Sequence, residues 1–177
     1  MIVAHHVVEQ IPSLRRYARA LTGGNAADAD DLVQDTLERA YVKWSLFRRG
    51  SRLRPWLFSI MHNLFINDLR RPERRVVLGS MDEALAIDTP ARQEQLVLVA
   101  EVLAAVARLP VDQREVLLLV SVEEFSYAEA ARILDIPVGT VMSRLFRARM
   151  QLRVLTGEQV AGDAVPALRL VKTGEAT

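Results

Sequence analysis

The chain has 177 residues, half of them hydrophobic and a quarter charged, which is enough apolar surface for the cores of one or two small domains. The formal net charge is only +1, but all except two of the 23 basic residues are arginines, whose planar group suits phosphate and guanine; a GC-rich genome would produce the same bias. There is no cysteine, the three histidines form no metal-binding pattern, and no segment has the ~20 apolar residues of a membrane span or the order of a signal peptide. We therefore expect a cytoplasmic protein without cofactor, metal or membrane insertion.

The first predicted helix covers residues 11–21. Pro12 suits its first turn, and the Gly23-Gly24 pair suits its end. One apolar stripe is expected to face the core: Leu14, Tyr17, Ala18 and Leu21. Three arginines lie off this stripe: Arg15, Arg16 and Arg19.

The second predicted helix covers residues 26–44 and follows Asn25, a good capping residue. Aspartates in its first turn are favourable beside the positive end of the helix dipole. Its inward positions are Ala29, Val33, Leu37, Ala40 and Trp44. An acidic face, defined by Asp31, Asp35 and Glu38, follows the outer side at intervals of four and three. This face is either ordinary solvated surface or a docking face for a basic partner.

Arginine is concentrated between residues 47 and 75, where eight arginines stand against only Asp68 and Glu73. A loop rich in glycine and arginine leads to Pro55, which is expected to open a third helix. That helix also carries three aromatic residues among polar ones: Trp56, Phe58 and Phe65. Arginines clustered beside aromatics are typical of proteins that bind single-stranded nucleic acid. Each aromatic taken separately is more typical of a core residue.

The segments between residues 73 and 122, and the tail after residue 157, have weaker sequence patterns. Residues 73–93 lack a period and are interpreted as an acidic linker. Residues 94–109 have a helical pattern, and Asp112 with Glu115 has the spacing of a cap and its return partner, so we expect another helix from there to residue 122. The small, apolar tail after residue 157 is expected to be mobile.

A pair of short helices joined by a tight turn is the strongest local prediction. Ser126 and Glu129 have the spacing of a capping box, so the first helix should begin directly after the serine. It should end near Asp135, because Pro137 disfavours a helical residue before it, and the second helix should begin at about Val138. The expected buried residues are Ala130, Ala131 and Leu134 in the first helix and Val141, Leu145, Ala148 and Leu152 in the second.

The outer face of the second helix is strongly basic, because residues 138–153 contain four arginines and no acidic residue. The second helix of a helix-turn-helix lies in the major groove of DNA, where its first residues reach base edges and its arginines pair with phosphate or guanine. The bland alternative is a solvated face on an ordinary helical bundle. Capping, turn, stripe and charge agree on a helix-turn-helix that binds duplex DNA.

Three segments together resemble a known family: DADDLVQDTLERAYVKW, RPWLFSIMHNLFINDLRR and LPVDQREVLLLVSVEEFSYAEAARILDIPVGTVMSRLFRARMQL. In this order they are similar to the extracytoplasmic-function (ECF, group IV) sigma factors of bacterial RNA polymerase. The resemblance implies an all-α fold of two small helical domains joined by a flexible linker. The domains implied are sigma region 2 over 1–75, a linker over 76–94, sigma region 4 with its helix-turn-helix over 95–157, and a flexible tail over 158–177.

The resemblance also implies residue roles. Region 2 would read and melt the −10 promoter element with Arg54, Ser59, Asn63, Arg70 and Arg71. Region 4 would read the −35 element as duplex with Thr140, Ser143, Arg144, Arg147 and Arg149. The acidic face would dock on the clamp helices of the largest polymerase subunit. Met142 stands where many relatives carry a basic residue, so the −35 preference cannot be copied from them.

The expected function is that of a binding protein without chemistry of its own. It would bind core RNA polymerase through the clamp helices and the flap region, direct initiation at promoter DNA, and be held inactive by a cognate anti-sigma factor, in a stress or envelope response. One alternative is a dimeric helix-turn-helix regulator, which leaves the acidic face and the arginine-rich third helix unused. Another is a sigma-like decoy for an anti-sigma factor, which is expected to lose base-reading arginines that this chain retains. An enzyme is disfavoured because no nucleophile, metal cluster or phosphate loop is evident.

Overall fold

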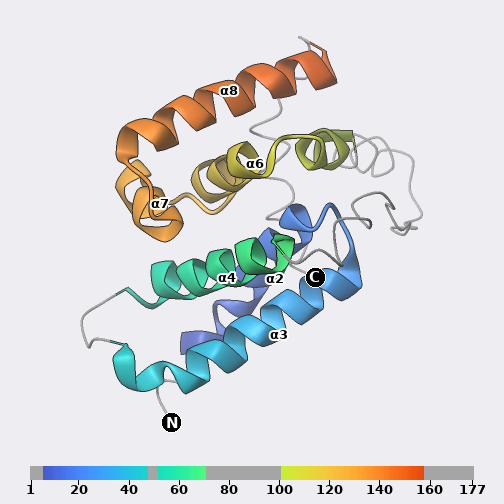
Figure 1. Ribbon diagram of the computed structural model, residues 1–177. Coiled ribbons are helices and arrows are strands. Elements are labelled where there is room, and N and C mark those ends of the chain that lie inside the picture. Colours follow the sequence, from blue (N-terminus) through green and yellow to red (C-terminus); the bar gives the residue numbers. More distant parts are fainter. Residues whose placement is uncertain (1–5, 48–51, 71–100, 158–177) are drawn as a thin grey trace.

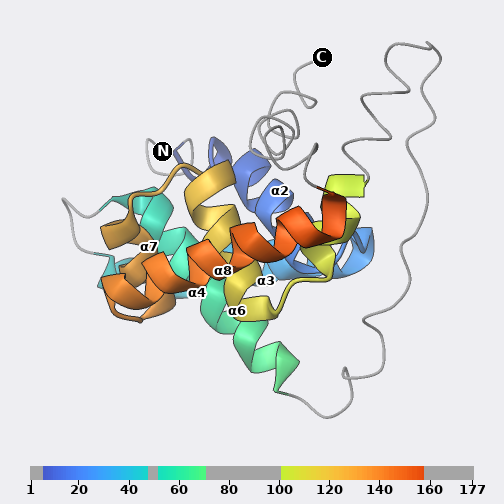
Figure 2. The same cartoon turned by 90° about the horizontal axis from the view of Figure 1, so that it is seen from above.

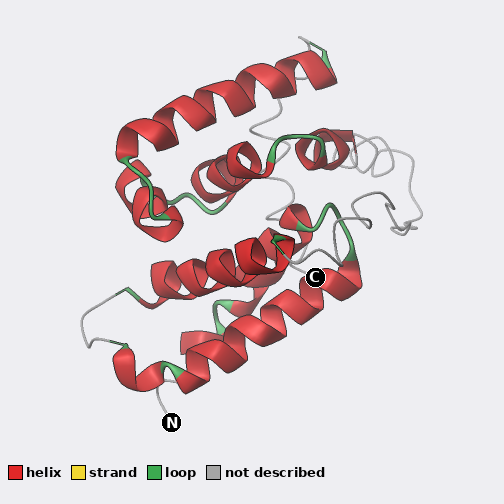
Figure 3. Cartoon of the chain, viewed as in Figure 1, coloured by secondary structure: helices red, strands yellow, loops and turns green. Residues whose placement is uncertain are grey.

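The computed structural model describes residues 6–47, 52–70 and 101–157, and every regular element within these ranges is helical (Figures 1 and 3). The predicted linker and tail lie outside the described residues, as does Arg71.

Three α-helices form what we call the N-terminal unit: α2 (Ile11–Leu21), α3 (Ala26–Val42) and α4 (Leu53–Leu69). The predicted bounds of α2 and its buried stripe are confirmed. The Asn25 cap is also confirmed, because its side chain accepts a hydrogen bond from the Asp28 amide at 3.1 Å. The local signals therefore place the first two helices correctly.

Two predicted boundaries in this unit are wrong by two residues. Helix α3 ends at Val42, and Trp44 begins a 3₁₀ turn, η1 (Trp44–Leu46), instead of continuing the helix. The Trp44 ring packs against Phe47 and Trp56, with centroids 5.2 and 5.9 Å apart. Helix α4 begins at Leu53 and not at Pro55. A proline fits anywhere in the first turn, because the first amides of a helix have no partner within it.

The C-terminal unit contains a helical segment over residues 101–107, then α6 (Val111–Leu117), a π-helical turn η3 (Leu118–Val122), α7 (Tyr127–Leu134) and α8 (Val138–Thr156). The capping role predicted for Asp112 is wrong, because Pro110 is the N-cap and no side chain caps this helix. Glu115 is buried and pairs with His62 of α4. His62, a partner from another helix, therefore binds the carboxylate that the local pattern assigned to a cap.

The helix-turn-helix is confirmed in detail. Ser126 and Glu129 form the reciprocal capping box at the start of α7. Asp135 ends α7 in the left-handed conformation, with φ of 53°, a backbone region that aspartate tolerates better than most residues. The residues of α8 that are buried are the predicted four: Val141, Leu145, Ala148 and Leu152.

The two units pack against each other and share one core, with α8 lying across the outer side of the C-terminal unit (Figures 1 and 2). Helix α4 contacts α7, and α2 contacts α6 and η3. At the centre of this junction the ring of Phe125 meets that of Phe58 edge-on, with centroids 5.0 Å apart. This contact brings the predicted reader of the −10 element against the unit that carries the helix-turn-helix.

Candidate nucleic-acid interface

The outer face of α8 presents the residues predicted to read the −35 element. Ser143, Arg147 and Arg149 are exposed, whereas Thr140 and Arg144 are half-exposed. Arg144 is held by Asp112 of α6, with Nε 3.2 Å from the carboxylate. In the described residues no ion pair engages the other two arginines, so this face offers uncompensated positive charge.

Sequence reasoning did not recognise an exposed apolar row along the same helix. It consists of Val138, Met142, Phe146, Met150 and Val154, four residues apart. The sequence contains this pattern, because residues four apart are neighbours along one inclined ridge of a helix. Helix α8 therefore carries exposed apolar residues in addition to its buried stripe.

Ser59, Asn63 and Arg70 share one side of α4, because they follow one another at intervals of four and seven residues. The Ser59 hydroxyl donates to the Trp56 carbonyl at 2.8 Å, and the Asn63 amide donates to the Ser59 carbonyl at 2.7 Å. Arg70 is exposed at the C-terminal end of α4. The buried positions of Phe58 and Phe65 confirm that these two aromatics belong to the core, whereas Trp56 is half-buried.

Arg54, the remaining described −10 candidate, is engaged by the C-terminal unit. Its Nη2 donates to Glu123 Oε2 at 2.6 Å, and its guanidinium lies over the Phe125 ring, 4.5 Å from the centroid. Glu123 is fully buried and also accepts from Arg16, through Nε at 2.9 Å and Nη2 at 3.0 Å. The helical pattern placed Arg16 off the apolar stripe, yet the residue is buried. Its ion pair with Glu123 satisfies the charge there.

Two more pairs flank this centre. Arg52 Nη1 donates to Glu129 Oε1 at 2.6 Å, and His62 Nδ1 lies 2.6 Å from Glu115 Oε1. Tyr17 is buried between these charges: burial raises the pKa of its phenol well above the usual value, and the nearby carboxylates of Glu115 and Glu123 raise it further.

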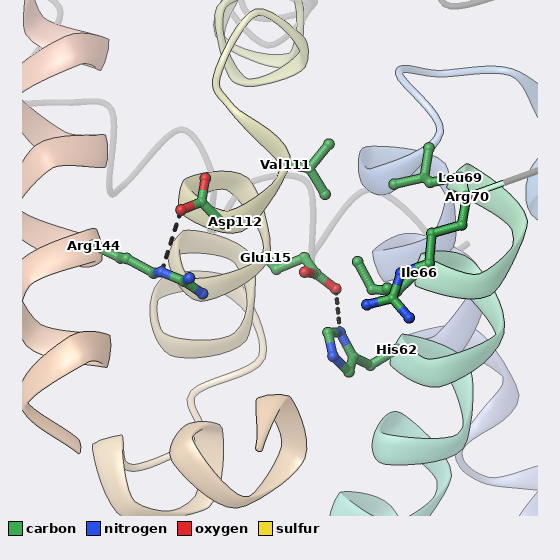
Figure 4. Close-up of a pocket in the computed structure, with 8 residues that line it drawn as sticks. All are labelled: His62, Ile66, Leu69, Arg70, Val111, Asp112, Glu115 and Arg144. Carbon is green, nitrogen blue, oxygen red and sulfur yellow. Dashed lines mark hydrogen bonds and ion pairs between the residues drawn. The ribbon is translucent and has the colours of Figure 1, made fainter. Parts of the chain in front are cut away.

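Clefts lie at both ends of the junction. One, of about 460 Å³, has α4 on one side and α6 and α8 on the other, with Arg70 and Arg144 on opposite walls (Figure 4). The second, of about 810 Å³, separates the first half of α4 from α7; Ser59 lines one wall and Glu129 the other. Ser59 and Arg70 thus face the C-terminal unit across these clefts, whereas Asn63 is exposed and lines neither of them.

The acidic face of α3 lies in the N-terminal unit, and its three residues, Asp31, Asp35 and Glu38, are all exposed. Glu38 accepts a hydrogen bond from Gln34 at 3.0 Å, and no ion pair holds the three carboxylates within the described ranges. They therefore form a negative surface open to a partner. Among the described residues no cluster of side chains suits a metal ion, and no helix is long and apolar enough to cross a membrane.

Comparison with known proteins matches both units. Residues 7–62 match the family model described as the Sigma2 domain of PhyR, and residues 100–152 match Sigma-70, region 4. The ECF RNA polymerase sigma factor EcfG of Rhodopseudomonas palustris is 42% identical over 160 residues, which cover 90% of this chain and 88% of the relative. The ECF RNA polymerase sigma factor SigM of Bacillus subtilis is 36% identical over 133 residues, covering 72% and 78% of the two chains.

A solved structure agrees with these relatives. The sigma factor RpoE of Bartonella quintana, crystallised with the anti-sigma factor NepR, superimposes with a TM-score of 0.72 at 37% identity, covering 87% of this chain and 96% of RpoE. The predicted all-α fold with sigma regions 2 and 4 is thereby confirmed. The chain belongs to the family of ECF RNA polymerase sigma factors.

Proposed function

We propose that this sigma factor binds core RNA polymerase and directs it to promoters by reading duplex −35 DNA with α8 and the unpaired −10 strand with α4. The observation that carries the proposal is the outer face of α8, the second helix of a helix-turn-helix, on which Arg147 and Arg149 are exposed and no acidic residue is present. Such a helix binds DNA in the major groove. Catalysis belongs to the polymerase, and the protein acts where transcription occurs, in the cytoplasm at the nucleoid.

The −35 contacts proposed are Thr140, Ser143, Arg144, Arg147 and Arg149, and the −10 contacts are Arg54, Ser59, Asn63, Arg70 and Arg71. The acidic face on α3 docks on the clamp helices of the largest polymerase subunit. Two DNA contacts on one chain raise the effective concentration of each other, so each tolerates modest affinity alone. The domain limits proposed are 1–75 for region 2, 76–94 for the linker, 95–157 for region 4 and 158–177 for the tail.

Control by an anti-sigma factor is part of the proposal. It is supported by the similarity to RpoE, a sigma factor solved in complex with the anti-sigma factor NepR. The partner would cover surfaces that the polymerase or the promoter needs.

Transcription reconstituted with core polymerase on fragmented genomic DNA, with sequencing of RNA 5′ ends, tests the proposal. The wild-type chain should produce a defined set of start sites. Arg147→Ala should lower initiation at these sites about tenfold, because one specific arginine–base contact contributes roughly 1–3 kcal/mol. Binding to core polymerase, measured by gel filtration, should not change. Arg153→Ala, near the far end of the same helix, is the matched control and should have little effect.

The triple variant Asp31→Asn, Asp35→Asn, Glu38→Gln should give the opposite result. It should lose affinity for core polymerase while the chain still binds DNA through α8. If the wild-type chain gives no reproducible start sites with core polymerase, the sigma function is wrong. A regulator would alter transcription only when another sigma factor is already present, and a decoy would bind an anti-sigma factor but not the core enzyme.

A further inference from the structure

The junction between the two units joins acidic groups of one to basic groups of the other. Three carboxylates of the C-terminal unit, those of Glu115, Glu123 and Glu129, face three guanidinium groups and one imidazole of the N-terminal unit. The basic partners are Arg16 on α2 and Arg52, Arg54 and His62 on or beside α4. Glu129 of α7 pairs with Arg52 just before α4, and Glu115 of α6 pairs with His62 in the middle of α4. Glu123, which follows η3, pairs with Arg54 between them.

Glu123 is bound as a phosphate would be. Its two oxygens accept two hydrogen bonds from Arg16 and a third from Arg54, all between 2.6 and 3.0 Å. Arginine presents the same planar donors to carboxylate and to phosphate. The aromatic support of Phe125 beneath Arg54 completes a site in which an anion is the required occupant.

The carboxylates also occupy the space that a strand along α4 would need. Glu129 lines the cleft that contains Ser59, and Glu115 lines the one that contains Arg70. Either cleft has its opposite wall in the C-terminal unit. A DNA strand therefore cannot reach Arg54 at the start of α4 until the units separate, although Asn63 and Arg70 are exposed.

Such a junction is suited to opening. An intact buried ion pair contributes little net stability relative to separated, hydrated charges, whereas removal of one partner leaves an uncompensated buried charge and strongly destabilises the closed arrangement. Both sets of charged groups regain water when the units part, so the cost of opening falls on the apolar contacts of the shared core, such as that between Phe58 and Phe125, and on the hydrogen bond from Arg114 to the Leu21 carbonyl. Binding of DNA to the freed arginines would offset it.

We propose that the C-terminal unit is an intramolecular substitute for the −10 strand: Glu115, Glu123 and Glu129 hold the basic groups of α4 and Arg16 and keep the free protein closed. The inference rests on the proposed function of α4. It adds that Arg54 and the start of α4 are masked by the protein's own second unit before any partner binds.

The first measurement is energy transfer between dyes on the two units. The chain has no cysteine, so Tyr41→Cys and Val154→Cys, which are 84% and 82% exposed, give two specific labelling sites outside the junction. Glu123→Gln and Glu129→Gln, separately and together, should broaden the transfer distribution toward longer distances. Glu101→Gln makes the same charge change at an exposed position of the same unit and should leave the distribution as in wild type.

The second measurement is fluorescence anisotropy with a fluorescein-labelled, random-sequence single-stranded DNA 12-mer. If only the open fraction of the protein can bind DNA, the apparent affinity is reduced by that fraction. Glu123→Gln and Glu129→Gln, which favour the open state, should therefore bind this DNA about fivefold more tightly than wild type, or tighter still. Glu101→Gln controls for the loss of one negative charge.

Glu123 is buried, and its replacement alone risks misfolding. Arg52, whose side chain is 79% exposed, pairs with the half-buried Glu129 at the edge of the junction. Glutamine retains the capping role of Glu129, so Arg52→Gln and Glu129→Gln supply variants with an intact core. If these variants keep the wild-type helical circular dichroism and also the wild-type energy transfer and DNA affinity, the closed state is not held by the glutamates. A wild-type chain that shows this closure but fails to program core polymerase would instead overturn the sigma function alone.

Discussion

Arg114 shows how much of the junction depends on single buried charges. Its guanidinium donates to the carbonyls of Leu21 at 2.7 Å, of Leu109 at 3.1 Å and of Ala107. These carbonyls lie at or just beyond the ends of α2 and of the helical segment 101–107, where a helix leaves its last carbonyls without partners. Burial lowers the pKa of Arg114, and the nearby Glu115 raises it in part, but an arginine stays charged. One side chain therefore closes helix ends in both units.

Arg114→Met should lower the free energy of unfolding by about 3 kcal/mol, because a hydrogen bond from a charged group contributes roughly 1.5–3 kcal/mol and some freed carbonyls will find water. Urea unfolding followed by circular dichroism measures this value. Arg108→Met, at an exposed position, is the control and should stay within about 0.5 kcal/mol of wild type. A loss below about 1 kcal/mol for Arg114→Met would show that the carbonyls do not depend on the guanidinium.

The sequence could not predict these residues, although it predicted their neighbours. Leu14 and Tyr17 follow from helical spacing, because burial of an apolar stripe repeats along one helix. Arg16 lies on that same helix, but its partner is 107 residues away, and no local pattern links the two. Arg16 and Glu123 are charged residue types that are usually exposed, and only the tertiary fold brings them together. The ion pairs between the two units therefore could not be predicted from the sequence.

At the scale of elements, two identical spacings had opposite outcomes. Ser126 and Glu129 form the predicted capping box, because every group involved lies within three residues and Ser126 has the extended backbone of a cap. Asp112 and Glu115 have the same spacing, yet Pro110 precedes the helix and His62 of α4 binds the glutamate. A local motif can therefore be predicted when no tertiary partner competes for its side chains.

The capping box of α7 predicts a pH dependence. Hydrogen bonds from the Ser126 side chain and backbone, with a smaller effect of Arg52, lower the pKa of Glu129 from 4.5 to about 2. A carboxyl whose pKa is lower in the folded state stabilises the fold above its unfolded pKa, and this stabilisation is lost as the pH falls from about 4.5 towards 2. The thermal midpoint of wild type should exceed that of Glu129→Gln at pH 6, and the difference should close towards pH 2.

Glutamine preserves the geometry of the box, so the comparison isolates the charge. Ser126→Ala removes the cap itself and should cost about 1 kcal/mol at every pH. A difference between wild type and Glu129→Gln that does not change with pH would contradict the assigned cause.

At the scale of the whole molecule, the two sigma regions, which match separate family models, share one hydrophobic core. The ring of Phe125 in the C-terminal unit packs on Phe58 in α4, which in turn packs on Tyr17 at 5.1 Å. Coupled units should unfold together, whereas two domains on a flexible linker should unfold separately. The distribution of tryptophan makes the difference measurable, because both tryptophans, Trp44 and Trp56, are in the N-terminal unit.

Thermal unfolding of wild type should therefore give one transition, with the same midpoint by tryptophan fluorescence and by far-ultraviolet circular dichroism. Phe125→Ala removes a buried ring from the C-terminal unit, and such a change costs about 3–5 kcal/mol. At roughly 2–4 °C per kcal/mol for a chain of this size, the tryptophan midpoint should fall by about 10 °C although neither tryptophan is changed. Phe146→Ala, at a 66% exposed position of α8, should move neither signal appreciably. If Phe125→Ala lowers only the circular dichroism midpoint and leaves the tryptophan midpoint in place, the two units are not coupled, and the closed junction contributes nothing to the stability of region 2.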